Sequence, residues 1–188
     1  MTTALRILGV SGSLRAKSYN SALLHAAIEL APADMVIEEY VGIGGLPLYN
    51  PDIDTNGGPP QAVAWRQAVR AADGLLIASP EYNFGPTAAL KNAIDWASRP
   101  PSDSCLHRKP IALMGASTGT SGTTRAQLAL RQSFVFTQSF VLPGPEVLVG
   151  AAATRFDADL RLTDAATRGF VQRLLIRLAE YTRRLSTA

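Results

Sequence analysis

Hydroxyl, amide and basic side chains crowd residues 11–21, which read SGSLRAKSYNS. An apolar run at residues 5–10 precedes them and predicts a buried strand, and residues 20–31 predict a helix that Pro32 ends. A loop between a parallel strand and a helix directs backbone N–H groups, and the positive end of the helix, at one spot. The stretch therefore favours phosphate binding. The alternative is an ordinary strand–helix turn with a Ser or Asn cap.

Two well-known phosphate loops do not fit this stretch. Lys17 and Ser18 match the end of a Walker A loop, but positions 11 and 16 hold Ser and Ala where that loop needs glycine. The dinucleotide pattern GxGxxG is also absent, because Gly9 and Gly12 have the wrong spacing. The prediction is a phosphate loop of another type, built on side-chain hydroxyls.

Composition narrows the class of protein. The 188 residues are 47% hydrophobic, which predicts one globular domain spanning residues 1–188. Cys105 is the only cysteine, and the two histidines do not form an HExxH motif, so an iron–sulfur cluster, a dithiol centre and a zinc site are all disfavoured. With no signal-peptide pattern and no membrane-length apolar run, we expect a cytoplasmic protein that does not bind a membrane. The net charge of +3 comes without a dense basic patch, which disfavours nucleic-acid binding.

Strand and helix patterns alternate along the whole chain. Strands are expected at residues 5–10, 35–40, 74–79, 111–116 and 146–149, and helices at residues 20–31, 61–72, 87–98, 122–138 and 164–184. This alternation predicts an α/β fold, a doubly wound, flavodoxin-like parallel sheet of five strands in the order 2-1-3-4-5 with helices on both faces. A long loop rich in Gly, Pro, Asn and Asp, at residues 42–60, interrupts the pattern.

Ligands of such sheets bind at the carboxyl ends of the strands beside the point where the strand order reverses. Three loops leave carboxyl ends there, at residues 11–19, 80–85 and 117–121, so we expect them to meet in space. The second loop, SPEYNFGPT, is stiffened by two prolines and carries an aromatic ring and an amide that suit a planar heterocycle. Glu81 could be read as a general base, but a structural or solvent-facing role is favoured because no His or second carboxylate lies near it in sequence. The third loop has small hydroxylated residues and glycines, which allow close approach to a ligand but are also ordinary loop material.

Three motifs carry a resemblance to a known family. They are GSLRxxSxN at residues 12–20, PEYNxxPxxxLKNAIDW at residues 80–96 and STGxxGxxRAQxxLR at residues 117–131. Together they resemble the NADPH-dependent FMN reductases, a family that includes quinone, azo-dye and chromate reductases. The third motif departs from the double glycine usual in the family, because Thr123 follows Gly122.

The resemblance implies a set of site residues. Around the FMN phosphate it places Ser11, Ser13, Arg15, Ser18, Asn20 and Ser21. Along the isoalloxazine, mostly through backbone groups, it places Pro80, Glu81, Tyr82 and Asn83, and on the other side Ser117, Thr118 and Gly119. No catalytic side chain and no metal are implied, because the flavin carries the hydride chemistry.

The resemblance also implies a homodimer or homotetramer with the flavin near an interface. One helix, residues 87–98, is a plausible part of that interface through Lys91, Asn92, Asp95 and Trp96, and the alternative is packing within the chain. The loop at residues 46–54 is then expected to cover the flavin of a neighbouring subunit.

Three functions remain open at this point. The first is an FMN-dependent NAD(P)H oxidoreductase that takes hydride from NADPH or NADH and passes it to a small-molecule acceptor, such as a quinone, free flavin, an azo dye or a metal oxyanion. The second is a flavodoxin-like electron carrier, although the chain lacks the TxTGxT phosphate loop and the acidic surface usual in flavodoxins. The third is a regulatory or assembly protein that has the fold without flavin.

Overall fold

In the computed structural model, which describes residues 4–186, the strands are β1 (Leu5–Ser11), β2 (Met35–Glu39), β3 (Gly74–Ala78), β4 (Pro110–Ala116), β5 (Phe140–Val141) and β6 (Val147–Val149). The central strands β3 and β4 are buried along their whole length, as expected for a sheet covered by helices on both faces. All pairings are parallel, in the order β2-β1-β3-β4-β5, and β6 also pairs with β4. The expected order 2-1-3-4-5 is confirmed.

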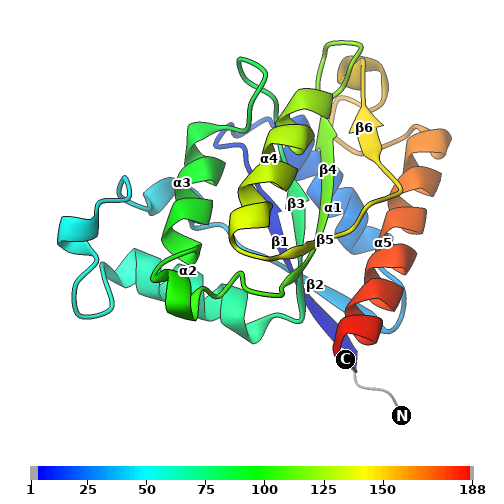
Figure 1. Cartoon of the computed structure of the whole chain (residues 1–188). Helices are drawn as coiled ribbons and strands as arrows, with labels where there is room; N and C mark the ends of the chain where they lie inside the picture. The colour runs from blue at the N-terminus through cyan, green and yellow to red at the C-terminus, as the bar shows by residue number, and fades with distance from the viewer. Residues whose placement is uncertain (1–3, 187–188) are drawn as a thin grey trace.

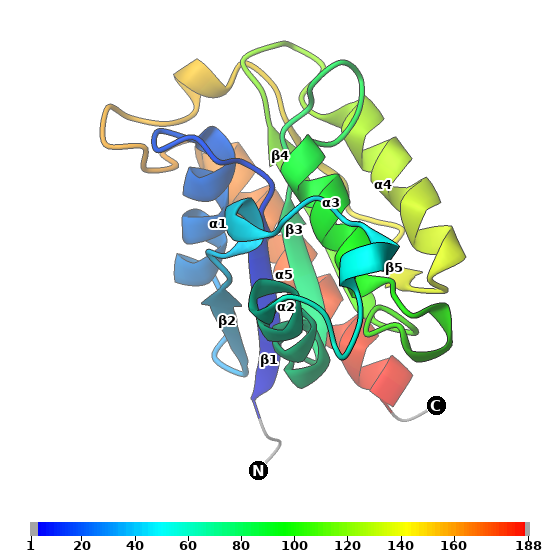
Figure 2. The ribbon, with the colours of Figure 1, turned by 90° about the vertical axis from the view of Figure 1, so that its left-hand side faces the viewer.

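Five helices cover the two faces of this sheet (Figures 1 and 2). They are α1 (Tyr19–Glu29), α2 (Pro60–Ala71), α3 (Ala88–Ala97), α4 (Thr124–Phe136) and α5 (Ala165–Ser186). Helices α1 and α5 pack on one face, and α2, α3 and α4 pack on the other. Within the described residues, no helix is long and apolar enough to cross a membrane.

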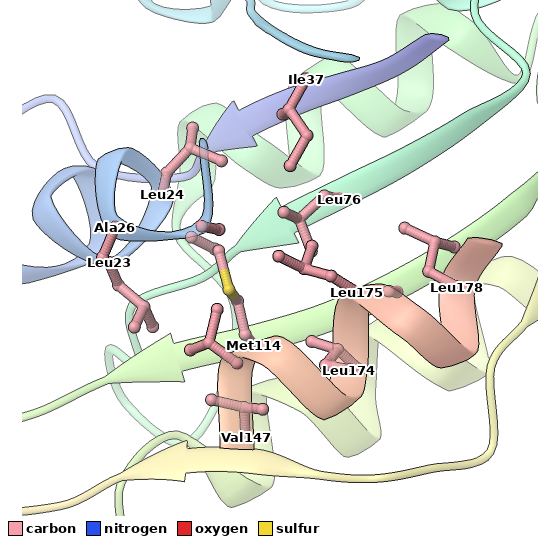
Figure 3. Close-up of a cluster of buried hydrophobic side chains, with 14 of the residues drawn as sticks. Leu23, Leu24, Ala26, Ile37, Leu76, Met114, Val147, Leu174, Leu175 and Leu178 are labelled. Carbon is pink, nitrogen blue, oxygen red and sulfur yellow. The ribbon is translucent and has the colours of Figure 1, made fainter. Parts of the chain in front are cut away.

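Alternate strand residues divide the core between the two layers. On β3, Leu76 faces α1 and α5, whereas its neighbour Leu75 faces α2, α3 and α4. Figure 3 shows the first of these clusters, in which Met114 of β4 lies between Leu23 of α1 and Leu174 of α5. Because both faces are filled, the carboxyl ends of the strands are held in fixed positions relative to one another.

The fifth strand differs from the expectation. One strand was expected at residues 146–149, but the structure has two short strands, with β5 pairing at the start of β4 and β6 at its end. Pro143 and Pro145 lie between them, and a proline has no N–H to donate to a strand ladder. A two-residue strand such as β5 has no periodicity that a sequence pattern could reveal.

The long loop at residues 42–60 is anchored rather than loose. It contains two short 3-10 turns, Ile43–Gly45 and Pro51–Ile53. Arg66 of α2 donates to both carboxylate oxygens of Asp54, at 2.9 and 2.7 Å, and its Nε donates to the carbonyl of Trp96. The loop is therefore tied to α2 and α3 at the same time.

Candidate active site

The three loops expected to meet do meet, at the carboxyl edge of the sheet, which is uppermost in Figures 1 and 2. A cavity of about 170 Å³ is lined by residues of all three. Its lining consists of Ser13, Arg15, Ser18, Tyr19, Asn20, Pro80, Glu81, Tyr82, Ala116, Ser117 and Thr118. Backbone bonds join the loops below it: Gly12 N donates to the Ala78 carbonyl, and Ser79 N donates to the Met114 carbonyl.

The first loop is organised by its own hydroxyls. Ser18 caps α1, its Oγ accepting from the backbone N–H groups of Asn20 and Ser21 at 3.2 Å each. Ser11 Oγ and Ser21 Oγ lie 2.9 Å apart, and Ser13 N donates to Ser11 Oγ. Ser13 and Ser18 line the 170 Å³ cavity, so the first loop presents hydroxyls beside the start of α1, a position that suits an anion.

Arg15 supplies the positive charge at this place. It is exposed, and its side chain lines both the 170 Å³ cavity and a neighbouring cleft of about 310 Å³. Ser11 and Ser21 line that cleft, together with Tyr40. Partial burial raises the pKa of the Tyr40 phenol, so it is protonated and able to donate at neutral pH.

Asn20 links the first loop to β4. Its Nδ2 donates to the Ala116 carbonyl and its Oδ1 accepts from Ala116 N, both at 2.9 Å. The side chain is buried, and the two bonds engage both ends of its amide. Asn20 lines the cavity, but its amide is occupied in holding the first loop to the third.

The second loop forms a tight turn beside the cavity. Tyr82 and Gly85 exchange two backbone hydrogen bonds of 3.0 Å, and Asn83 and Phe84 between them have φ angles of 51° and 64°. Paired positive φ values at the two central residues define a type I′ turn. Because of this turn, Tyr82 is 53% exposed and Phe84 is 68% exposed.

Thr87 holds the base of the second loop. Its hydroxyl donates to the Gly12 carbonyl at 2.6 Å and accepts from Leu90 N at the start of α3. Unlike Pro80, Glu81 and Tyr82 of the same loop, Asn83 does not line the 170 Å³ cavity. It lines a separate groove of about 690 Å³ between the turn, α3 and α4.

The third loop requires close contact between backbones. A Cβ on Gly115 would collide with Thr123 Oγ1 and with the Ser79 carbonyl, so only glycine fits under the start of α4. Thr123 is fully buried, and Gly122 before it has a φ of 61°. Thr123 therefore fills space above Gly115 where the resembling family has a second glycine. Ser117 Oγ accepts from Gly119 N, and the Gly119 carbonyl accepts from Ala151 N.

The residues expected at an interface on α3 divide into two pairs. Lys91 and Asp95 are at the surface and form an ion pair of 2.6 Å. Asn92 and Trp96 are buried, and both donate to the Pro47 carbonyl. For the second pair the alternative reading applies, since their side chains pack within the chain and hold the long loop against α3.

Three residues in or beside the cavity were not expected from sequence, namely Tyr19, Ala116 and Arg125. Tyr19 lines the cavity and stacks at a tilt on Phe156, with ring centroids 5.3 Å apart. Arg125 of α4 pairs with Glu81 and lies over Phe84. Among the described residues, no group of three or more His, Cys, Asp or Glu could hold a metal ion. The cavity lining offers hydroxyls and a guanidinium, which suit a phosphorylated organic group.

The comparisons with known proteins agree with this chemistry. The sequence profile of the NADPH-dependent FMN reductases matches residues 5–154. The chain belongs to that family. An NAD(P)H-dependent FMN reductase of Pseudomonas aeruginosa is 49% identical over 98% of this chain and 99% of its own. A 2-hydroxy-1,4-benzoquinone reductase from a Burkholderia species is 41% identical over 96% of this chain and 97% of its own.

A solved structure gives the same answer for the fold. FerB, a flavoenzyme NAD(P)H:(acceptor) oxidoreductase from Paracoccus denitrificans, has a TM-score of 0.87 at 29% identity, covering 96% of this chain and 98% of its own. Membership of this family confirms the flavodoxin-like fold, the oxidoreductase class and the dependence on FMN and NAD(P)H. The serines, Arg15 and the first turn of α1 fit the phosphate of FMN.

Proposed function

We propose that this FMN reductase uses the three-loop cavity to hold FMN and transfers reducing equivalents from NAD(P)H to a quinone or another small acceptor. The observation that carries the proposal is the single cavity lined by all three loops, with hydroxyls and Arg15 at one end. FMN supplies the hydride chemistry when bound, so the protein contributes position, charge and access. The names of the relatives support a quinone or flavin as the acceptor.

In this proposal the first loop binds the phosphate. The hydroxyls of Ser13 and Ser18, the Arg15 guanidinium and the start of α1 lie around one anion position, and Ser11 and Ser21 support the loop from the neighbouring cleft. A phosphate of roughly −1.5 to −2 charge is stabilised there by charge-assisted hydrogen bonds and by the helix dipole. Asn20 acts by fixing the loop to β4.

The second and third loops bind the ring system. Pro80, Glu81 and Tyr82 line one side of the cavity, and Ser117 and Thr118 line the other. Asn83 lies in the turn that follows Tyr82, and Gly119, the residue after Thr118, donates to Ser117 Oγ. The Glu81 carboxylate is bound by α4, so the site has no evident general acid or base, in agreement with chemistry carried by the flavin.

A homodimer is part of the proposal. Beside the site, Tyr82 and Phe84 are exposed, and α4 exposes Leu128, Val135 and Phe136. A second copy packed on this face would bury these side chains and complete the cover of the flavin.

The mass of the protein in solution tests the dimer. Analytical ultracentrifugation of the wild type should give twice the chain mass, or four times if dimers pair, and Leu128→Glu should shift it towards one chain. Ile176→Glu, on the exposed side of α5, is the matched control and should leave the mass unchanged. A wild type of single-chain mass would contradict the proposed dimer.

We also propose a cytoplasmic location, which cell fractionation would test.

Anaerobic absorption spectroscopy tests the reaction itself. Purified protein with FMN should show flavin bands that bleach promptly on addition of NADPH and return when 1,4-benzoquinone is added. Steady-state oxidation of NADPH should follow when quinone is in excess. Flavin bands that persist with NADPH would favour the electron carrier instead, and a protein that binds no FMN would overturn the assignment of the three loops.

A further inference from the structure

The Glu81 side chain does not face solvent, because its carboxylate lies at the start of α4. Its Oε2 accepts from the backbone N–H groups of Arg125 and Ala126, at 2.9 and 3.1 Å, and its side chain is only 10% exposed. These are two of the N–H groups that a helix leaves without partners in its first turn. A carboxylate at this end of a helix is further stabilised by the dipole.

Arg125 extends this contact to the other end of the turn. Its guanidinium lies 3.6 Å from Glu81 Oε1 and 4.1 Å from the centroid of the Phe84 ring. Phe84 is 68% exposed and has a positive φ, which is costly for a bulky residue. The cation–π contact with Arg125 helps to hold it there. The turn is therefore held to α4 at both ends.

We propose that Glu81 is a positioning residue for the flavin. Its carboxylate locks residues 80–85 to the start of α4, so that the backbone groups around Tyr82 have one fixed geometry at the isoalloxazine. This inference rests on the proposed function, because it takes the three-loop cavity as the flavin site. It assigns Glu81 a role through its side chain, in addition to the backbone role that the family resemblance implies.

The contacts of Glu81 with Arg125 and Ala126 are called the clamp below. The position of the clamp predicts which part of the flavin it helps to bind. Glu81 follows β3 and serves the loop assigned to the ring, whereas Arg15 serves the loop assigned to the phosphate. Loss of the Glu81 carboxylate should therefore weaken the binding of FMN and of riboflavin by the same factor. Loss of the Arg15 guanidinium should weaken the binding of FMN but leave that of riboflavin, which has no phosphate, unchanged.

The experiment compares Glu81→Ala, Glu81→Gln and a control, Glu180→Ala, which removes only an exposed ion pair on α5. Dissociation constants for FMN and riboflavin are measured by flavin fluorescence, after circular dichroism has shown that each variant is folded. Glu81→Ala should weaken both flavins by about tenfold or more, the scale of a hydrogen bond to a charged group. Glu81→Gln keeps an acceptor oxygen and should restore most of the affinity, and the control should match the wild type.

Hydrogen exchange of the flavin-free protein provides an independent readout. Glu81→Ala should speed exchange at the Arg125 and Ala126 amides and across residues 82–85, with no change in β1 or β3. Folded Glu81→Ala that binds both flavins like the wild type, or that loses affinity for FMN alone, would overturn the proposal. A wild type that binds neither flavin would overturn the proposed function and the positioning role with it, while exchange would still report whether the clamp exists.

Discussion

Asn20 and Ala116, 96 positions apart in the sequence, exchange two hydrogen bonds of 2.9 Å. The side chain of Asn20 thus pairs with the end of β4 as a neighbouring strand residue would. This contact joins the first loop to the third loop without adding a strand.

Replacing Asn20 tests this contact. Asn20→Ala would leave the buried N–H and carbonyl of Ala116 without partners, at roughly 1–3 kcal/mol for each unsatisfied group. We expect the free energy of unfolding, measured by urea denaturation without flavin, to fall by about 2–4 kcal/mol. Asn20→Asp should also destabilise, because its carboxylate would face the Ala116 carbonyl. A loss below about 1 kcal/mol for Asn20→Ala would contradict the structural role.

Arg15→Ala tests the phosphate end of the site. The variant loses a charged donor, so FMN binding should weaken by about 1.5–3 kcal/mol, measured by fluorescence titration. Added salt should reduce the difference in FMN affinity between the wild type and the variant, because salt screens the charge of an exposed arginine. Arg177→Ala, at an exposed pair on α5, is the control. Unchanged FMN affinity in Arg15→Ala would remove this residue from the site.

Two arginines of α2 give a matched test of burial. Arg66 pairs with Asp54 where both side chains are nearly buried, at 10% and 13% exposure, whereas Arg70 pairs with Asp103 at 44% and 68% exposure. Arg66→Ala should lower the free energy of unfolding by about 3–5 kcal/mol, because it leaves a buried charge without its partner. Arg70→Ala should cost about 1 kcal/mol or less. Both variants are measured by thermal and urea unfolding. An equal loss of unfolding free energy in Arg66→Ala and Arg70→Ala would contradict the importance of burial.

The carboxylate of Asp164 makes the free energy of unfolding depend on pH. Its carboxylate accepts hydrogen bonds from the hydroxyl and backbone N–H of Thr167 and pairs with Arg155, so its pKa is held below the ordinary value. The unfolded chain binds the proton more readily, so this group stabilises the fold above its ordinary pKa, and stability is lost as the pH falls through the folded pKa. Acid unfolding between about pH 5 and 2 should therefore be less steep in Asp164→Asn than in the wild type. Asp159→Asn, on an exposed loop residue, is the control, and identical profiles for all three proteins would contradict the prediction.

Much of the architecture was predictable because it depends on periodic apolar patterns. The runs at residues 5–10 and 111–116 are apolar apart from Arg6, so their parallel pairing and the meeting of their loops followed from general rules of α/β folds. The expected helix bounds differ from the observed ones by one or two residues at every end, because caps and turns decide where a helix begins and ends. The short β5 has too few residues to form any pattern.

Contacts between distant side chains were not predictable. The partner of Glu81 lies 44 positions away on α4, and nothing near Glu81 in sequence pointed to it. The resemblance placed Asn92 and Trp96 at a plausible subunit interface, whereas in the structure both donate to the Pro47 carbonyl, a contact that has no signal in the sequence. The resemblance could suggest which residues surround a flavin, but only coordinates show how those residues hold one another.

The two edges of the sheet limit how this protein can associate. One edge is the five-residue β2, whose Glu38 faces solvent in a pair with Arg6, and the other is broken by Pro143 and Pro145 between β5 and β6. Short, charged or proline-interrupted edges resist the addition of a strand from another chain, which is a common route to aggregation. Self-association is therefore directed away from the sheet and towards the surfaces of the helices.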